Sequence, residues 1–156
     1  MAKHPAVGEQ APDFELDGTH GPFKLSDHHG ERVMLLFHPG DETPVCTKQF
    51  CEYRDNAQAF GSLGVTAVGI SGKDVDSKRR FAERNDLPVP LLADPDFEVS
   101  KAYGAYSGLG RMPKRAVIVI DEQGRVAHRH DHALGLDFQT VADLQQTLDG
   151  LPAAAA

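Results

Sequence analysis

The chain has 156 residues, of which 40% are hydrophobic and 25% charged, a size and composition typical of one globular domain with a single core. Its formal net charge of −7 argues against a nucleic-acid or anionic-membrane partner, because such binding surfaces need clustered Lys and Arg. The sequence has no run of about 18 apolar residues and no apolar N-terminal run of signal-peptide type, which predicts a cytoplasmic protein whose partners are small molecules or soluble proteins.

The N-terminal part predicts a small appendage to a main sheet. Phe14–Leu16 and Phe23–Leu25 alternate between apolar and polar residues, and an Asp-Gly turn signal lies between them, so we expect an N-terminal hairpin. Residues 26–27, Ser and Asp, resemble the start of a short helical turn. Val33–Phe37 then forms a continuous apolar run, which is typical of a central strand buried on both faces.

The middle of the chain predicts alternating strands and helices. Apolar residues at steps of three and four, Tyr53 among them, indicate a helix over 47–60, and a sparser pattern indicates another over 75–85. Val65–Ser71 lies between them as a strand. The order strand, helix, strand, helix is typical of an α/β sheet. Residues 87–95 contain three prolines, which limit this segment to a short or edge strand.

The next part of the chain predicts a helix, a loop and a hairpin. Residues 97–103 can form a short helix, and the three glycines within 104–113 predict a flexible loop after it. Ala116–Ile120 is a second buried apolar run. An Asp-Glu-Gln-Gly turn connects it to residues 125–128, so we expect these two strands to pair.

The clearest amphipathic helix lies near the C-terminus. Residues 137–148 carry apolar side chains at steps of three and four, and Gly150 stands at the C′ position. Residues 151–156 are expected to be a frayed tail. The chain is therefore predicted to be a single α/β domain over residues 1–150.

Both cysteines lie in one stretch, residues 37–51, which runs from the end of a predicted strand through a loop into a predicted helix. Unpaired N–H groups and the helix dipole at a helix start favour the thiolate form of a cysteine placed there. In a reducing compartment a pair of cysteines is more often catalytic or metal-binding than a structural bridge. Cys46 is therefore the candidate nucleophile.

The spacing of the two cysteines constrains how they can react. Cys46 and Cys51 would have Cα atoms roughly 8.7 Å apart if both lay on one α-helix. A disulfide needs Cα atoms within about 7 Å of each other. A bond between them would therefore require at least the first turn of the helix to unwind, which couples a thiol–disulfide cycle to local unfolding.

The sequence gives less support to other roles for the two cysteines. Buried cysteines often act as small hydrophobic residues, but a loop with Pro39, Thr43 and Pro44 is an unusual way to deliver core residues. A zinc site usually has a gap of about two to four residues and a second pair of ligands. The spacing likewise excludes a Cys-x-x-Cys reductase, although the order of strand, loop, cysteine and helix is the same.

The pattern Pro39-x-x-x-Thr43-x-x-Cys46, after a strand and opening a helix, resembles the active-site motif of the peroxiredoxins. Cys51 resembles the resolving cysteine of the peroxiredoxin Q subfamily, also called bacterioferritin comigratory protein. The resemblance covers most of residues 7–150. Three further segments match the family's pattern: Gly8–Phe14, Tyr53–Asp55 and Arg115–Asp121.

The resemblance implies a thioredoxin-like fold, with a central mixed sheet flanked by helices, and the reduction of hydrogen peroxide or organic hydroperoxides. Cys46 would attack the peroxide and become a sulfenic acid. Cys51 would resolve this acid to an intramolecular disulfide, which thioredoxin or a similar dithiol protein would reduce. The resemblance includes no cofactor and no metal. The absence of a large apolar stripe makes a monomer the expected state.

The other motif residues would support this chemistry. Thr43 and Arg115 can donate hydrogen bonds to a developing oxyanion, and Arg115 can also hold the thiolate charge. Pro39 has no N–H and can shield the thiolate from water. Taken alone, Thr43 could equally cap a helix and Arg115 could form a surface salt bridge. Gln49, where many relatives have Glu, is not assigned to catalysis but can hydrogen-bond within the pocket.

Two other functions remain open. A redox sensor would use the same disulfide to change shape and bind a partner, without steady-state turnover. A metal-binding module would use His128, His130 and His132, which would face one side of a strand. Adjacent rings would be about 7 Å apart at Cβ, so an exposed polar strand end is the preferred interpretation of these histidines. His28, His29 and His38 are likewise expected to be exposed, and His38 is also a candidate residue at the edge of the pocket.

Overall fold

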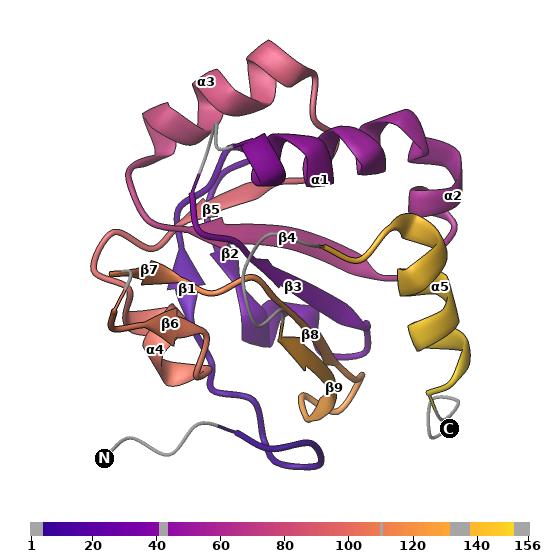
Figure 1. Ribbon diagram of the computed structural model, residues 1–156. Coiled ribbons are helices and arrows are strands. Elements are labelled where there is room, and N and C mark those ends of the chain that lie inside the picture. Colours follow the sequence, from indigo (N-terminus) through magenta and orange to yellow (C-terminus); the bar gives the residue numbers. More distant parts are fainter. Residues whose placement is uncertain (1–4, 41–43, 110, 132–137, 152–156) are drawn as a thin grey trace.

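The computed structural model describes residues 5–40, 44–109, 111–131 and 138–151. A five-stranded mixed sheet lies at the centre (Figure 1), with the order β5-β4-β3-β8-β9. β3, β4 and β5 are parallel, whereas β8 and β9 run antiparallel to their neighbours. The strands are β3 (Val33–Phe37), β4 (Thr66–Ser71), β5 (Leu91–Ala93), β8 (Ala116–Ile120) and β9 (Val126–Asp131).

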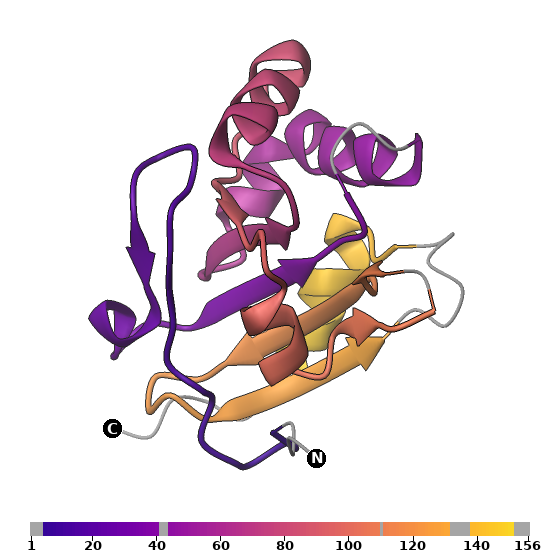
Figure 2. The same ribbon diagram turned by 90° about the vertical axis from the view of Figure 1, so that its left-hand side faces the viewer.

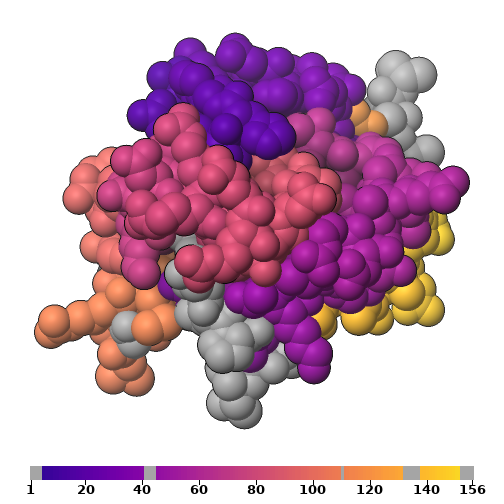
Figure 3. Space-filling model, turned by 90° about the horizontal axis from the view of Figure 1, so that it is seen from above, coloured from indigo at the N-terminus to yellow at the C-terminus, as the bar shows by residue number. Residues whose placement is uncertain are grey.

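Each face of the sheet has its own hydrophobic core. On one face pack α1 (Pro44–Asp55), α2 (Ala57–Gly61), α3 (Val75–Asn85) and α5 (Val141–Asp149). The other face is covered by α4 (Glu98–Ala102) and by the N-terminal segment. Figure 2 shows α1 and α3 on the same side of the strands. Seen from that side, α3 and α1 lie next to each other and α5 lies at the edge beyond α1 (Figure 3).

The predicted mixed sheet with flanking helices is confirmed. Both five-residue apolar runs are fully buried central strands, because helices cover one face and the N-terminal segment and α4 cover the other. The segment with three prolines is the edge strand β5. The N-terminal hairpin is confirmed as β1 (Glu15–Leu16) paired with β2 (Phe23–Lys24), followed by the 3-10 helix η1 (Leu25–His28).

The predicted helix over 47–60 was wrong in two respects. It begins earlier, at Pro44, because a proline in the first turn of a helix needs no N–H partner and has a suitable φ. It is also interrupted at Asn56, which separates α1 from α2. The Asn56 side-chain amide donates to the Glu52 carbonyl oxygen at 2.9 Å and shares this acceptor with the Asn56 backbone N–H, at 3.1 Å.

Three smaller corrections concern the loop 104–113 and the C-terminal helix. The loop contains a short antiparallel pair, β6 (Tyr106–Ser107) with β7 (Met112–Pro113), closed by the Lys114 N–H bond to the Ala105 carbonyl. α5 begins later than expected, after Thr140, which forms a capping box with Asp143. Gly150 is its C-cap with φ of −81°, so the left-handed C′ geometry is absent.

Of the predicted frayed tail, residues 152–156 lie outside the described part of the chain. Leu151 is described and is packed, partly buried, against the core between the sheet and α5. The first residue of the predicted tail therefore contacts the core.

We expect Gly69→Ala to destabilise the protein by about 1–3 kcal/mol, because overpacking a dense core forces side chains to move. Gly69 lies on β4, and an added Cβ would come within 2.8 Å of Leu91 Cδ2 and 3.0 Å of Phe50 Cζ. Denaturant unfolding would measure the loss. Gly61→Ala is the control, since nothing lies within 4 Å of the Cβ it would add. Equal stability of the two variants would contradict the packing described here.

Candidate active site

Cys46 lies in the first turn of α1 and is fully buried. The chain reaches it from the end of β3 through residues 38–43, of which 41–43 are outside the described residues. The N-terminus of α1 therefore meets the carboxyl end of the central strand. A helix start offers unpaired N–H groups and a positive dipole end, which favour a thiolate at this position.

Arg115 is brought to Cys46 by the pairing of two central strands. Phe37, the last residue of β3, pairs with Ala116, the first residue of β8, so Arg115 lies beside the end of β3. Its Nη2 is 3.0 Å from Cys46 Sγ. With 1% of its surface exposed, Arg115 is not the surface salt-bridge residue considered as an alternative. The contact places a permanent positive charge against the sulfur.

A chain of hydrogen bonds continues from Arg115 away from the thiol. Arg115 Nη1 donates to Gln49 Oε1, and Gln49 Nε2 donates to the Tyr53 hydroxyl at 3.0 Å. The Tyr53 hydroxyl in turn donates to the Gln139 carbonyl oxygen at 2.8 Å. Burial raises the pKa of Tyr53 above its ordinary value, so its hydroxyl keeps the proton that it donates. These contacts connect the thiol to the start of α5.

Cys51 lies in the same helix and faces α3. Its side chain is partly buried, and its Sγ is 3.7 Å from Oδ1 of Asn85, the last residue of α3. Both cysteines are free thiols and both lie within Pro44–Asp55, which confirms that a single helix carries them. Regular helix geometry separates their Cα atoms by roughly 8.7 Å, so a bond between them requires α1 to unwind.

Two buried basic side chains lie near the carboxyl ends of the parallel strands β3 and β4. His38 follows β3 and is fully buried, so it does not lie at the pocket edge as expected. Burial, together with the charges of Lys78 and Arg115, holds the pKa of His38 well below its ordinary value. Lys78 of α3 donates to the Ser71 hydroxyl and, at 2.7 Å, to the Gly72 carbonyl oxygen. The imidazole of His38 is therefore neutral at neutral pH.

The remaining predicted site residues are less closely defined. Pro39 is half-buried between β3 and α1. Thr43 and His132 lie outside the described residues. His128 and His130 lie on β9. We expected both to be exposed, but His128 is partly buried, and this burial lowers its pKa. Within the described ranges, no group of three or more His, Cys, Asp or Glu side chains is placed to hold a metal ion.

Sequence reasoning gave Tyr53 and Gln139 no role in the site. The hydrogen bonding expected of Gln49 within the pocket is confirmed by its contacts with Arg115 and Tyr53. Gln49 and Tyr53 are four residues apart, so their shared helix face was available as a signal. Gln139 contributes a backbone carbonyl, for which the sequence carries no signal.

None of the helices in the described part of the chain is both long enough and apolar enough to cross a membrane.

The arrangement suits a nucleophilic thiolate. The sulfur is removed from bulk water, lies at a helix start and contacts a guanidinium group that can also donate to an oxygen atom bearing negative charge. Cys51 is near enough in sequence to trap an oxidised Cys46, but only in another conformation of α1.

The chain is similar to known proteins in both sequence and structure. A model described as the AhpC/TSA family matches residues 7–129. The chain is 39% identical over 149 residues to the chloroplastic peroxiredoxin Q of Arabidopsis thaliana, covering 94% of this chain and 67% of that protein. It is 34% identical over 127 residues to peroxiredoxin Bcp of Bacillus subtilis, covering 77% of this chain and 81% of that protein. The crystal structure of peroxidoxin BcpB from Mycobacterium tuberculosis superposes on this chain with a TM-score of 0.81 at 33% identity. The match covers 96% of this chain and 100% of that chain.

Proposed function

Because the chain belongs to the AhpC/TSA family and is a peroxiredoxin, a thiol-dependent peroxidase with a thioredoxin-like fold, we propose that Cys46 is its peroxidatic cysteine. The contact between Arg115 and the buried Cys46 sulfur carries this assignment. Arg115 would stabilise the thiolate, and Thr43 would donate to the peroxide as the family motif implies. Pro39 would shield the sulfur from water.

In the first step the Cys46 thiolate attacks one peroxide oxygen. An S–O bond forms and the O–O bond breaks, so the sulfur loses two electrons and becomes a sulfenic acid. The other oxygen leaves as hydroxide or alkoxide and takes up a proton to become water or an alcohol. Arg115 can donate to this oxygen as its charge develops, which lowers the barrier.

In the second step the sulfur of Cys51 attacks the sulfenic acid. An S–S bond forms and water leaves, which gives an intramolecular disulfide. α1 must unwind around Cys46 before the two sulfur atoms can meet. Thioredoxin or a similar dithiol protein would then reduce the disulfide by exchange and allow α1 to refold.

We place this cycle in the cytoplasm of the cell, where a dithiol reductant is available, and in a monomer. Within the described residues the large exposed hydrophobic side chains are Val7, near the N-terminus, and Leu109 and Met112, in the segment from β6 to β7. Three such side chains do not form the broad apolar patch of a stable dimer. Sedimentation of the reduced protein would test the monomer. The redox-sensor alternative is set aside, since the family is one of enzymes.

We expect Cys51→Ser to retain the first oxidation of Cys46 but to lose turnover with a dithiol protein. The sulfenic acid would form at an unchanged rate because Cys51 does not contact Cys46, yet it would have no sulfur partner. Stopped-flow mixing with hydrogen peroxide and trapping of the sulfenic acid would measure the first oxidation. Undiminished thioredoxin-driven turnover in this variant would show that Cys51 is not the resolving cysteine.

A further inference from the structure

We propose that Tyr53, together with Glu52, is a positioning residue that holds α1 to the start of α5 and thereby sets how fast the Cys46–Cys51 disulfide closes. We call the contacts of Glu52 and Tyr53 with Gln139 and Val141 the α1–α5 link. The inference rests on the disulfide cycle proposed above.

Tyr53 joins the part of α1 that must unwind to a part of the fold outside it. Its hydroxyl accepts from Gln49, three residues after Cys46, and donates to the Gln139 carbonyl just before α5. Tyr53 is fully buried, and its ring stacks on Phe60 with 4.9 Å between centroids. The hydroxyl is thus held in place from both directions, and Gln49 can leave only by breaking a buried hydrogen bond.

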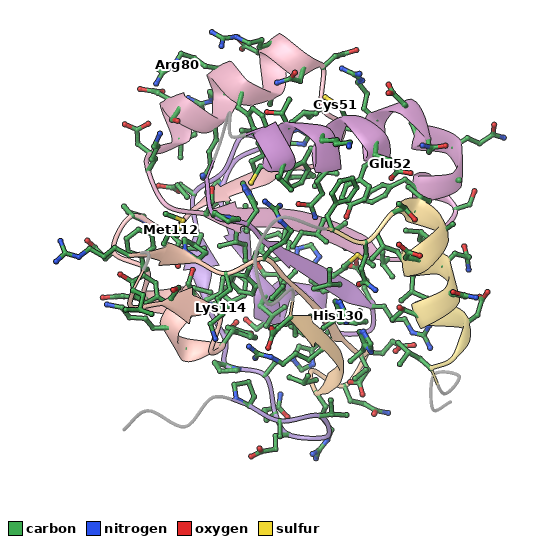
Figure 4. All side chains as sticks on the ribbon, viewed as in Figure 1. Cys51, Glu52, Arg80, Met112, Lys114 and His130 are labelled. Atoms are coloured by element: carbon green, nitrogen blue, oxygen red, sulfur yellow. The ribbon has the colours of Figure 1, made fainter. Side chains whose placement is uncertain are left out.

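Glu52 makes the second contact of the link. Its Oε2 accepts from the Val141 N–H at 3.1 Å, at the first residue of α5. A carboxylate at a helix start pairs with an unpaired N–H group and with the positive end of the dipole. In Figure 4, Glu52 lies on the side of α1 that faces α5, whereas Cys51 lies near α3. The two neighbouring residues therefore face different helices.

The start of α5 is a well-defined anchor for this link. Thr140 and Asp143 cap one another across the first turn, at 3.0 and 3.2 Å. Leu144 and Leu148 of the same helix are buried in the core. α5 can therefore keep its position while α1 changes.

The helix ladder indicates where unwinding stops. If residues through Cys51 unwind, the N–H groups of 52–55 lose their acceptors, the carbonyls of 48–51. The turn that remains is then held by its side chains: Glu52 to Val141, Tyr53 to Gln139, and Arg54 Nη1 to the Asn85 carbonyl at 2.7 Å. Gln49–Tyr53 is the side-chain bond that crosses the boundary, so it must break in each cycle.

The link holds the Tyr53 hydroxyl in place for Gln49. The Gln49–Tyr53 bond therefore favours the folded helix, in which Cys46 reacts with peroxide, over the unwound helix, in which the disulfide closes. Removing one hydrogen bond shifts such an equilibrium about fivefold. Faster closure leaves the sulfenic acid exposed to a second peroxide molecule for less time. Loss of the link should thus reduce conversion of Cys46 to the sulfinic acid.

The test is Tyr53→Phe in the full chain, compared with Tyr103→Phe as the matched control. Tyr103 is also fully buried and donates its hydroxyl to a carbonyl, that of Pro12, but on the opposite face of the sheet. Rapid mixing with hydrogen peroxide followed by mass analysis gives the closure rate and the sulfinic fraction. We expect about fivefold faster closure and a lower sulfinic fraction in Tyr53→Phe alone.

Unchanged closure in a folded Tyr53→Phe protein, or equal acceleration in both variants, would overturn the proposal. Glu52→Ala is the second variant, since it removes the Val141 contact that keeps the turn of Tyr53 in place for Gln49, without altering the buried hydroxyl. It should also accelerate closure, because the Gln49–Tyr53 bond is then less well positioned. If Tyr53→Phe does not fold, unchanged closure in Glu52→Ala would likewise overturn the proposal. Failure of the proposed function would look different, because the unaltered protein would then form no Cys46–Cys51 disulfide at all.

Discussion

Replacing Cys46 with Ser is expected to abolish peroxide consumption. A hydroxyl at this position would remain protonated beside Arg115, and its oxygen cannot take up the peroxide oxygen as sulfur does. The measurement is hydrogen peroxide loss in the presence of a thioredoxin reducing system. Ser is only slightly smaller than Cys, so the buried site should keep its packing. The circular dichroism spectrum and the thermal unfolding temperature should therefore change only slightly.

The control for this variant is Cys51→Ser, which has the same chemical change in the same helix. It should consume about one equivalent of peroxide per chain in the first oxidation and then only what further oxidation of the sulfenic acid takes up, without turnover, whereas Cys46→Ser should consume none. Full activity of Cys46→Ser would contradict the assignment of the nucleophile. Equal loss of the first oxidation in both variants would contradict the separate roles given to the two cysteines.

Replacing Arg115 with Ala is expected to lower the rate of Cys46 oxidation by about 10²–10³-fold, the usual effect of removing one donor from a developing oxyanion. The Cys46 sulfur would also lose its guanidinium partner, and Gln49 would lose the donor to its amide oxygen. Arg115→Lys should recover only part of the rate, because an ammonium group lacks the planar fork that reaches both partners. Stopped-flow oxidation by hydrogen peroxide measures both variants.

Arg129→Ala is the matched control for Arg115. Arg129 also donates through two guanidinium nitrogens, but to the carbonyls of Tyr103 and Gly104 at the end of α4, and it lies on β9. This variant should lose stability while its oxidation rate stays within a fewfold of the parent. A rate in Arg115→Ala as high as in Arg129→Ala would contradict the role of Arg115.

Part of this structure could be predicted from residue patterns alone. Val33–Phe37 and Ala116–Ile120 were correctly placed as buried strands, since five consecutive apolar residues suit a strand covered on both faces. The bounds of α3 at Val75 and Asn85 were also correct. These features depend on local composition, which a single sequence contains.

Other features depend on contacts between distant residues. The short β6–β7 pair was predicted as an irregular loop, because its glycines were the stronger local signal. Tyr53 was assigned to an apolar stripe, and its ring does lie in the core. Its hydroxyl, however, donates to a carbonyl 86 residues later in the chain. No local pattern reports such a partner, so the connection from the thiol to α5 required the structure.

Local sequence patterns indicated one part of the proposed site, and the family resemblance indicated the other. The helix start and the five-residue spacing identified Cys46 and the need to unwind, and both follow from helix geometry. The pairing of Cys46 with Arg115, 69 residues apart, came from the family resemblance, because only the β3–β8 register brings the two together.

The central claim is that one helix carries both cysteines and opens to join them. The most direct test is to mix the reduced protein with one equivalent of hydrogen peroxide and measure its intact mass without a reductant. We predict a monomer lighter by about two mass units, one for each thiol hydrogen lost. Peptide mapping of that species should show Cys46 bonded to Cys51. A covalent dimer, or a stable monomer that gains oxygen without losing those two hydrogens, would contradict the account.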